Sequence, residues 1–176
     1  MKNSFYCPRQ QQGASLVVVL ILLLLMTLLG LATLRGTTME ERMTANLYDR
    51  SLGFQAVESA LRQGEALARA TPVASVPASG CTNGVCSLPD PTAADRWLSS
   101  SFNGWRSASN DLATGNVPMP TASYIVEYVG MTPSWPACDR KVPVDALCLT
   151  PRFRITAISD SADRSIVLLQ TTYNVQ

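Results

Sequence analysis

The stretch that decides the fold is ASLVVVLILLLLMTLLGLATL, residues 14–34, which contains no charged side chain. At 1.5 Å per residue, a helix over this stretch is about 30 Å long, which matches the hydrocarbon core of a bilayer. The whole chain has 176 residues, and a buried helix in a domain of that size is rarely apolar on every side. The sequence therefore predicts a membrane-spanning helix over residues 14–34.

The charges on either side of this segment predict its orientation. Lys2 and Arg9 precede it without any acidic residue, whereas the arginines that follow it are offset by two glutamates. Excess positive charge stays on the cytoplasmic side, so we expect a cytoplasmic N-terminus and a globular part across the membrane. A secretory signal peptide is the competing interpretation, but its apolar run is shorter and its cleavage site follows that run.

A short motif stands directly before the apolar segment. QQQG, residues 10–13, followed by the apolar run, resembles the cleavage site of type IV prepilins. In that family a membrane-embedded peptidase cuts after the glycine and methylates the new N-terminus. The resemblance implies cleavage between Gly13 and Ala14, removal of residues 1–13 as a leader that includes Cys7, and N-methylation of Ala14. TTMEERMTANLYDRSLGFQAVESALR, residues 37–62, extends the resemblance to the PilX group of minor pilins.

The chain departs from the major pilins at the fifth mature position. Major pilins carry a glutamate there, and its partner is thought to be the N-terminal amine of the neighbouring subunit. This chain has Val18, which cannot neutralise an amine inside the apolar layer. We interpret Val18 as the mark of a subunit at the fibre tip, where no such pairing is needed. The alternative is a pilin-like protein that never enters a fibre.

The helical pattern continues over residues 35–70 with a different character. Apolar residues recur there at spacings near three and four, which is typical of one stripe of an amphipathic helix. The members of this predicted stripe are Met39, Met43, Leu47, Phe54, Val57, Leu61 and Ala68. Pro72 ends the pattern. We expect the stripe to hold a globular domain, with Gly30 and Gly36 making a softer stretch between the two halves of the helix.

Strand signals gather near the C-terminus. Residues 123–130, 152–159 and 165–175 alternate and are rich in β-branched and aromatic side chains, and the last two predict an antiparallel hairpin. Three strands against the amphipathic half-helix give an α+β fold, with a long N-terminal helix packed on a small antiparallel sheet. The pilin resemblance implies the same fold. The globular domain would then comprise residues 71–176.

The segment before these strands is less regular. Residues 87–122 are rich in proline, serine and asparagine, and residues 92–98 predict a short helix capped by Thr92. We expect the aromatic residues here and in the next loop to pack in the core or on loops. They are Trp97, Phe102, Trp105 and Trp135. A sugar-binding surface is the functional alternative.

Four cysteines remain after the leader, in two local pairs. Cys81 and Cys86 flank an Asn-Gly turn signal, and Cys138 and Cys148 enclose another turn-rich stretch. We favour the local disulfides Cys81–Cys86 and Cys138–Cys148, although four cysteines allow three connectivities and the sequence alone does not choose among them. A four-thiolate zinc site is the alternative, but the spacings fit it poorly. Disulfides would indicate an oxidising compartment.

The composition argues against catalysis and against nucleic acid as a partner. The chain has no histidine, a net charge of +1, and no visible nucleophile–base pair, phosphate loop or metal cluster. Asp160 and Asp163 supply too few carboxylates for a calcium loop. We therefore expect no enzyme activity, no cofactor, no metal and no nucleic-acid partner.

The resemblance implies a role in assembly. The protein would be a minor pilin that helps to initiate a type IV pilus and lies at or near its tip, supporting attachment and twitching motility. Its partners would be major and minor pilins, through the N-terminal helix, and the prepilin peptidase. It would lie in the bacterial inner membrane before entering a surface pilus. Two alternatives remain: a minor pseudopilin of type II secretion, and a single-span membrane protein whose periplasmic domain binds a ligand.

Overall fold

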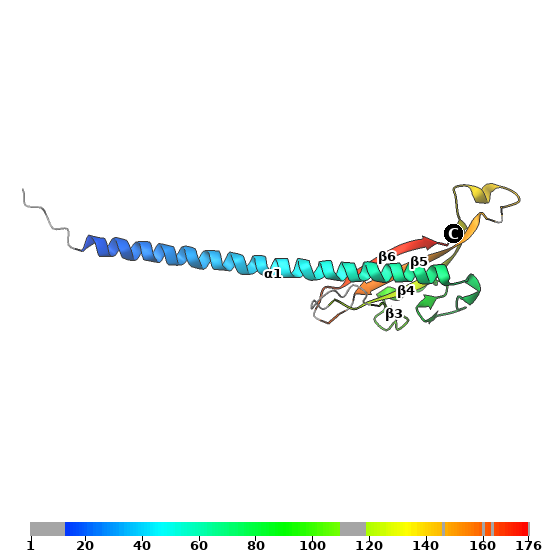
Figure 1. Ribbon diagram of the computed structural model, residues 1–176, viewed down its shortest axis with the longest axis horizontal. Coiled ribbons are helices and arrows are strands. Elements are labelled where there is room, and N and C mark those ends of the chain that lie inside the picture. The colour runs from blue at the N-terminus through cyan, green and yellow to red at the C-terminus, as the bar shows by residue number, and fades with distance from the viewer. Residues whose placement is uncertain (1–12, 110–118, 146, 160, 163, 176) are drawn as a thin grey trace, which may run out of the picture. The chain divides into compact units, whose positions relative to one another are not determined.

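The computed structural model describes residues 13–109, 119–145, 147–159, 161–162 and 164–175. Residues 1–12 of the predicted leader, which include Cys7, lie outside these residues, as do Asp160 and Asp163. The chain divides into two compact units, residues 1–45 and 46–176. Helix α1 (Ala14–Ala70) runs through both, and all strands belong to the second unit (Figure 1).

The predicted long helix is confirmed, and the chain itself explains where it ends. The side-chain hydroxyl of Thr71 donates to the carbonyl of Leu67 at 2.7 Å, and the Thr71 backbone N–H donates to the carbonyl of Ala68 at 3.3 Å. These bonds satisfy carbonyl groups that the last helical turn would leave unpaired. Pro72 then keeps the chain extended.

Over the described residues the sheet has six strands, and it is mixed rather than wholly antiparallel. Its order is β1 (Cys81–Thr82), β2 (Val85–Cys86), β4 (Ala122–Pro133), β5 (Leu149–Ser159) and β6 (Val167–Asn174), with β3 (Arg106–Ser107) also paired to β4. Only the β2–β4 pair is parallel among these described strands. The three predicted strands correspond to β4, β5 and β6, so the α+β prediction is confirmed. The two-residue strands were too short to predict.

Within the second unit, helix α1 packs on one face of the sheet through small residues. The core joins helix and sheet side chains: Ala56, Val57, Ala60, Ala68, Ala122, Tyr124, Val126, Phe153, Ile155, Ala157 and Val167. Gly64 is also buried, and a Cβ atom there would lie 2.5 Å from Cγ2 of Ile155 and 3.3 Å from Cδ2 of Tyr124. The helix therefore lies too close to the sheet to carry a larger residue at this point.

The predicted apolar stripe is only partly right. Val57 and Ala68 are buried, and Leu61 packs against the core as a partly buried residue. The other four members are exposed: Met39, Met43, Leu47 and Phe54. Met39 and Met43 belong to the first unit, which contains none of the described strands. In the second unit, the short distance between helix and sheet selects alanine and glycine for most of the contact. The large apolar side chains are left on the surface of the chain.

The predicted helix over residues 92–98 is wrong. Only Arg96–Leu98 forms a single 3₁₀ turn, η2. Thr92 does not cap a helix, because its backbone N–H and its hydroxyl both donate to Oδ1 of Asp90, at 2.8 and 2.6 Å. The aspartate thus holds residues 90–92 in a local turn that competes with helix formation.

Candidate functional site

The apolar part of helix α1, residues 14–34, is the first candidate site, and it is described here within the first unit alone. Its most apolar window has a mean hydropathy of 3.0, and none of that window is buried. The exposed fractions of its large side chains run from 49% at Leu25 to 72% at Met26. By length and composition this segment fits a single-pass membrane anchor.

The threonine hydroxyl groups in and after this segment donate hydrogen bonds to carbonyl groups of the same helix. Thr27 and Thr33 each donate to the carbonyl three residues earlier, at 2.8 and 2.9 Å. Thr37 and Thr38 both donate to the carbonyl of Leu34, at 3.0 and 3.3 Å. A hydroxyl bonded in this way needs no water, so it can be carried into a lipid environment.

The residues of the predicted cleavage site lie at the very start of helix α1. Gly13 precedes the helix with a φ of 113°, a conformation that favours glycine, and Ala14 is the first helical residue. Val18 follows one turn later and is 55% exposed. Residues four apart lie on the same helix face, so Val18 stands next to Ala14. Cleavage and methylation at this point stay predictions.

The stretch from residue 30 to residue 38 is helical throughout, although the sequence predicts it to be softer than its surroundings. A Cβ atom at Gly30 or at Gly36 would meet nothing within 4 Å. Neither glycine is therefore needed for packing inside this chain. Both leave the backbone open to a close neighbour, which is the usual role of small residues between helices in a membrane.

The four cysteines form the two local disulfides. Cys81 is bonded to Cys86, and Cys138 is bonded to Cys148, with sequence separations of 5 and 10 residues. These bonds leave none of the four sulfur atoms free for the alternative zinc site. Over the described parts of the chain, no group of three or more histidine, cysteine, aspartate or glutamate side chains is placed to hold a metal ion.

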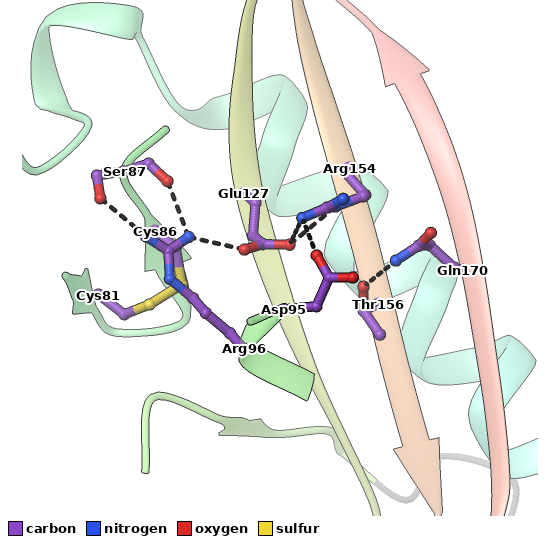
Figure 2. A network of polar contacts seen from close by, with 9 residues as sticks. All are labelled: Cys81, Cys86, Ser87, Asp95, Arg96, Glu127, Arg154, Thr156 and Gln170. Carbon is purple, nitrogen blue, oxygen red and sulfur yellow. Dashed lines mark hydrogen bonds and ion pairs between the residues drawn. A yellow bond between two sulfur atoms is a disulfide. The ribbon is translucent and has the colours of Figure 1, made fainter. Parts of the chain in front are cut away.

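A buried carboxylate lies on the sheet face opposite the helix. Val126 belongs to the core, so Glu127, the next residue of β4, projects from the other face. Its side chain is fully buried and accepts hydrogen bonds from Nη1 of Arg96 at 2.7 Å and from Nε of Arg154 at 2.9 Å (Figure 2). A buried charge is tolerated only with such partners.

The two arginines carry this network to neighbouring loops. Arg96 donates from Nη1 to the carbonyl of Ser87 at 2.9 Å and from Nη2 to its hydroxyl at 3.1 Å (Figure 2). The guanidinium carbon of Arg154 lies 4.2 Å from the ring centroid of Trp97. The network thus connects two loop segments to strands β4 and β5. These segments are Ser87, which follows the Cys81–Cys86 hairpin, and the η2 turn. Sequence analysis missed it, although a lone glutamate in an apolar strand was a signal.

A second polar contact fastens the helix to the segment before β6. Oδ1 of Asp49 accepts a hydrogen bond from Nε of Arg164 at 2.6 Å, and Oδ2 accepts one from the backbone N–H of Ser165 at 2.8 Å. These two contacts, the Ser165 N–H first, hold the pKa of Asp49 below its ordinary value of 3.8. Asp49 therefore anchors the helix to the rest of the second unit, close to the start of that unit at residue 46.

Two family models match the chain, and the break between them lies inside helix α1. Residues 12–62 match the PilX N-terminal model. Residues 66–175 match the model for the C-terminal part of the type IV pilus assembly protein PilX. No curated protein and no solved structure matches the chain. The matched segments include nearly all of helix α1 and every strand of the sheet.

Proposed function

The chain belongs to the PilX family of type IV pilus assembly proteins, and from that premise we propose that it is a minor pilin that helps to initiate a pilus and lies at or near its tip. The observation that carries the proposal is the apolar segment of residues 14–34, which has none of its most apolar window buried within the chain. Attachment and twitching motility would follow from the pilus that such subunits start.

The proposed mechanism is lateral packing of helices. In the membrane, residues 14–34 are surrounded by lipid, which is as apolar as the helix itself. Helices in this setting associate by close van der Waals packing, and small residues permit the closest approach. Gly30 and Gly36 offer such positions because no atom of this chain occupies the space beside them. Other minor pilins and the major pilin are the partners in this mechanism.

Maturation by a prepilin peptidase is part of the proposal. The peptidase would cut between Gly13 and Ala14, release the basic leader on the cytoplasmic side and methylate Ala14. The start of helix α1 at Ala14 supports this, because the expected scissile bond then joins a non-helical glycine to an intact helix. The retained segment still has the length that a membrane requires.

The proposed location is the bacterial inner membrane and later the surface pilus. A single pass with a cytoplasmic N-terminus puts the sheet domain in the periplasm. The two disulfides are consistent with this compartment, which is oxidising. The domain would then choose which neighbouring subunits fit beside it.

Mass spectrometry of the mature N-terminus in sheared pili tests the proposal. We expect the protein to begin at a methylated Ala14 and to be present in far smaller amounts than the major pilin. A Gly13→Val variant should keep its leader and disappear from the pili, because a branched side chain replaces the glycine at the cleavage site. A mature wild-type protein that retains Met1, or that begins after Leu34, would contradict the proposal.

A Val18→Glu variant tests the tip location. A carboxylate at this position could pair with the N-terminal amine of a neighbour, so the subunit should move from the tip into the shaft, or the number of pili should fall. Immunogold electron microscopy and pilus counts measure both outcomes. Val17→Glu is the matched control, because it adds the same charge on a different side of the helix. If Val18→Glu changes neither location nor number, the tip argument loses its support.

A further inference from the structure

A polar cavity of about 540 Å³ lies beside the Cys81–Cys86 hairpin. Its walls are Cys81, Asn83 and Gly84 on the hairpin and the Asn-Gly-Trp-Arg segment of residues 103–106. A volume of this size is within the range of small-molecule sites. The cavity takes no part in the helix packing proposed above, so its role is a separate question.

Two Asn-Gly pairs bring the walls of the cavity together. Gly84 has a φ of 83°, and a Cβ atom there would lie 2.6 Å from Cβ of Arg106. A Cβ atom at Gly104 would lie 2.9 Å from Cβ of Cys81. Only glycine allows these close approaches. The asparagines before the two glycines, Asn83 and Asn103, have exposed side chains.

Trp105 is the aromatic residue of the cavity lining. It is partly exposed, and its ring meets the ring of Phe102 edge to face, with centroids 5.8 Å apart. Such a contact restrains the indole before any ligand arrives, which lowers the entropic cost of binding. Arg106 is exposed beside it and donates from Nη1 to the carbonyl of Asn83 at 3.4 Å.

The hairpin that forms the opposite wall is also held in place. The Cys81–Cys86 disulfide closes it, and β2 is paired with β4 at Cys86 and Glu127. Ser87, the next residue, is bonded to Arg96, which is paired with the buried Glu127 (Figure 2). The hairpin wall is therefore fixed by covalent, strand and ionic contacts, as a preorganised binding site requires.

We propose that this cavity binds a saccharide unit. A sugar ring has a face of C–H groups, which suits the indole of Trp105, and a rim of hydroxyl groups. The amides of Asn83 and Asn103 can donate to and accept from hydroxyls, and the Arg106 guanidinium can donate to two at once. Within the described lining, Arg106 is the only ionisable side chain, so no carboxylate repels an acidic sugar. A single arginine offers little to a nucleic-acid backbone.

Binding can be measured on the full-length protein in a polyoxyethylene-ether detergent, which has no sugar headgroup. The probes are the methyl glycosides of glucose, galactose, N-acetylglucosamine and glucuronic acid, followed by saturation-transfer NMR. We expect saturable binding of at least one probe, with a dissociation constant on the order of 1 mM. Trp105→Ala should weaken that binding about tenfold. Asn103→Ala should also weaken it. Because the Asn103 side chain is exposed, we expect this variant to fold like the wild type.

Trp135→Ala is the matched control, because this tryptophan is 44% exposed and lies outside the cavity lining. It should leave binding unchanged, while thermal unfolding verifies that each variant keeps its fold. The proposal is overturned if none of the four glycosides binds saturably. It is also overturned if Trp135→Ala costs as much affinity as Trp105→Ala, or if folded Trp105→Ala and Asn103→Ala proteins both bind like the wild type.

Discussion

The two parts of helix α1 use side-chain size in opposite ways. In residues 14–34 the side chains are mostly leucine and valine, and they are exposed. In residues 52–68 the buried positions are mainly alanine and glycine. The difference teaches that the helix packs on its own sheet through small residues, which let the two backbones come close. Its large apolar groups remain available for lipid or, as we propose, for the helices of other subunits.

This difference has a simple physical origin. A sheet already presents large side chains, including Tyr124, Phe153 and Ile155, and these fill the space under the helix. Small helix residues let the backbone come close, so each sheet side chain gains more contacts. The described part of the first unit contains no strand, and its large helix side chains are exposed.

Gly64→Val is the sharpest way to break the comparison. The added atoms would overlap with Ile155 and Tyr124, so we expect a loss of about 3 kcal/mol in the free energy of unfolding of the sheet domain. Chemical denaturation of the full-length protein in detergent, followed by near-ultraviolet circular dichroism, measures it. Gly30→Val is the control and should change this free energy by less than about 0.5 kcal/mol. Equal effects of the two variants would show that the halves do not differ as described.

Two leucines, Leu47 and Leu52, show where helix α1 changes from exposed to buried apolar side chains. Leu52 is 8% exposed and Leu47 is 59% exposed. Leu52→Ala should lower the free energy of unfolding by about 2 kcal/mol, because it removes buried methyl groups. Leu47→Ala should lower it by less than about 0.5 kcal/mol. The same denaturation experiment measures both, and a larger loss for Leu47→Ala would restore the stripe predicted from the sequence.

Acid gives the smallest expected effect and probes the Asp49 contact. Because folding lowers the pKa of Asp49, this carboxylate stabilises the fold fully above its ordinary pKa of 3.8. That contribution is lost as the pH falls through the lower pKa of the folded state. Asp49→Asn should therefore reduce the fall in stability between neutral pH and the acid range. Denaturation at a series of pH values measures this, with Glu41→Gln, an exposed acid of the first unit, as the control. An unchanged pH profile for Asp49→Asn would refute the role of this contact.

Much of the fold could be predicted from local patterns. The long helix begins where the uncharged run of residues 14–34 begins, and it ends two residues before Pro72. Both signals are local, because hydropathy and the geometry of proline are read from neighbouring residues. A strand is predicted over residues 152–159, and its alternating residues Phe153, Ile155 and Ala157 are part of the observed core. These predictions succeeded because each depends on residues that are close in the chain.

The other features depend on distances across the fold. Gly64 is not a member of the predicted apolar stripe, yet a Cβ atom at this position would lie only 2.5 Å from Ile155. A pattern of hydrophobicity gives little weight to alanine and glycine, so the stripe that it selected matches the buried face only in part. Glu127 is paired with arginines 31 and 27 residues away, and no local spacing indicates which residues those are. The cavity beside Trp105 likewise needs two segments that only the sheet brings together.

Both disulfides join cysteines that are near neighbours in the chain, 5 and 10 residues apart. The entropic cost of closing a loop grows with its length, so these two pairs meet more often in an unfolded chain than any crossed pair. The correct bonds are then also the fastest to form. Oxidation needs no finished sheet as a template and little reshuffling of wrong bonds. Reduction would in turn release the β1–β2 hairpin and the segment that Cys138 and Cys148 enclose, and none of these cysteines belongs to the core between helix and sheet.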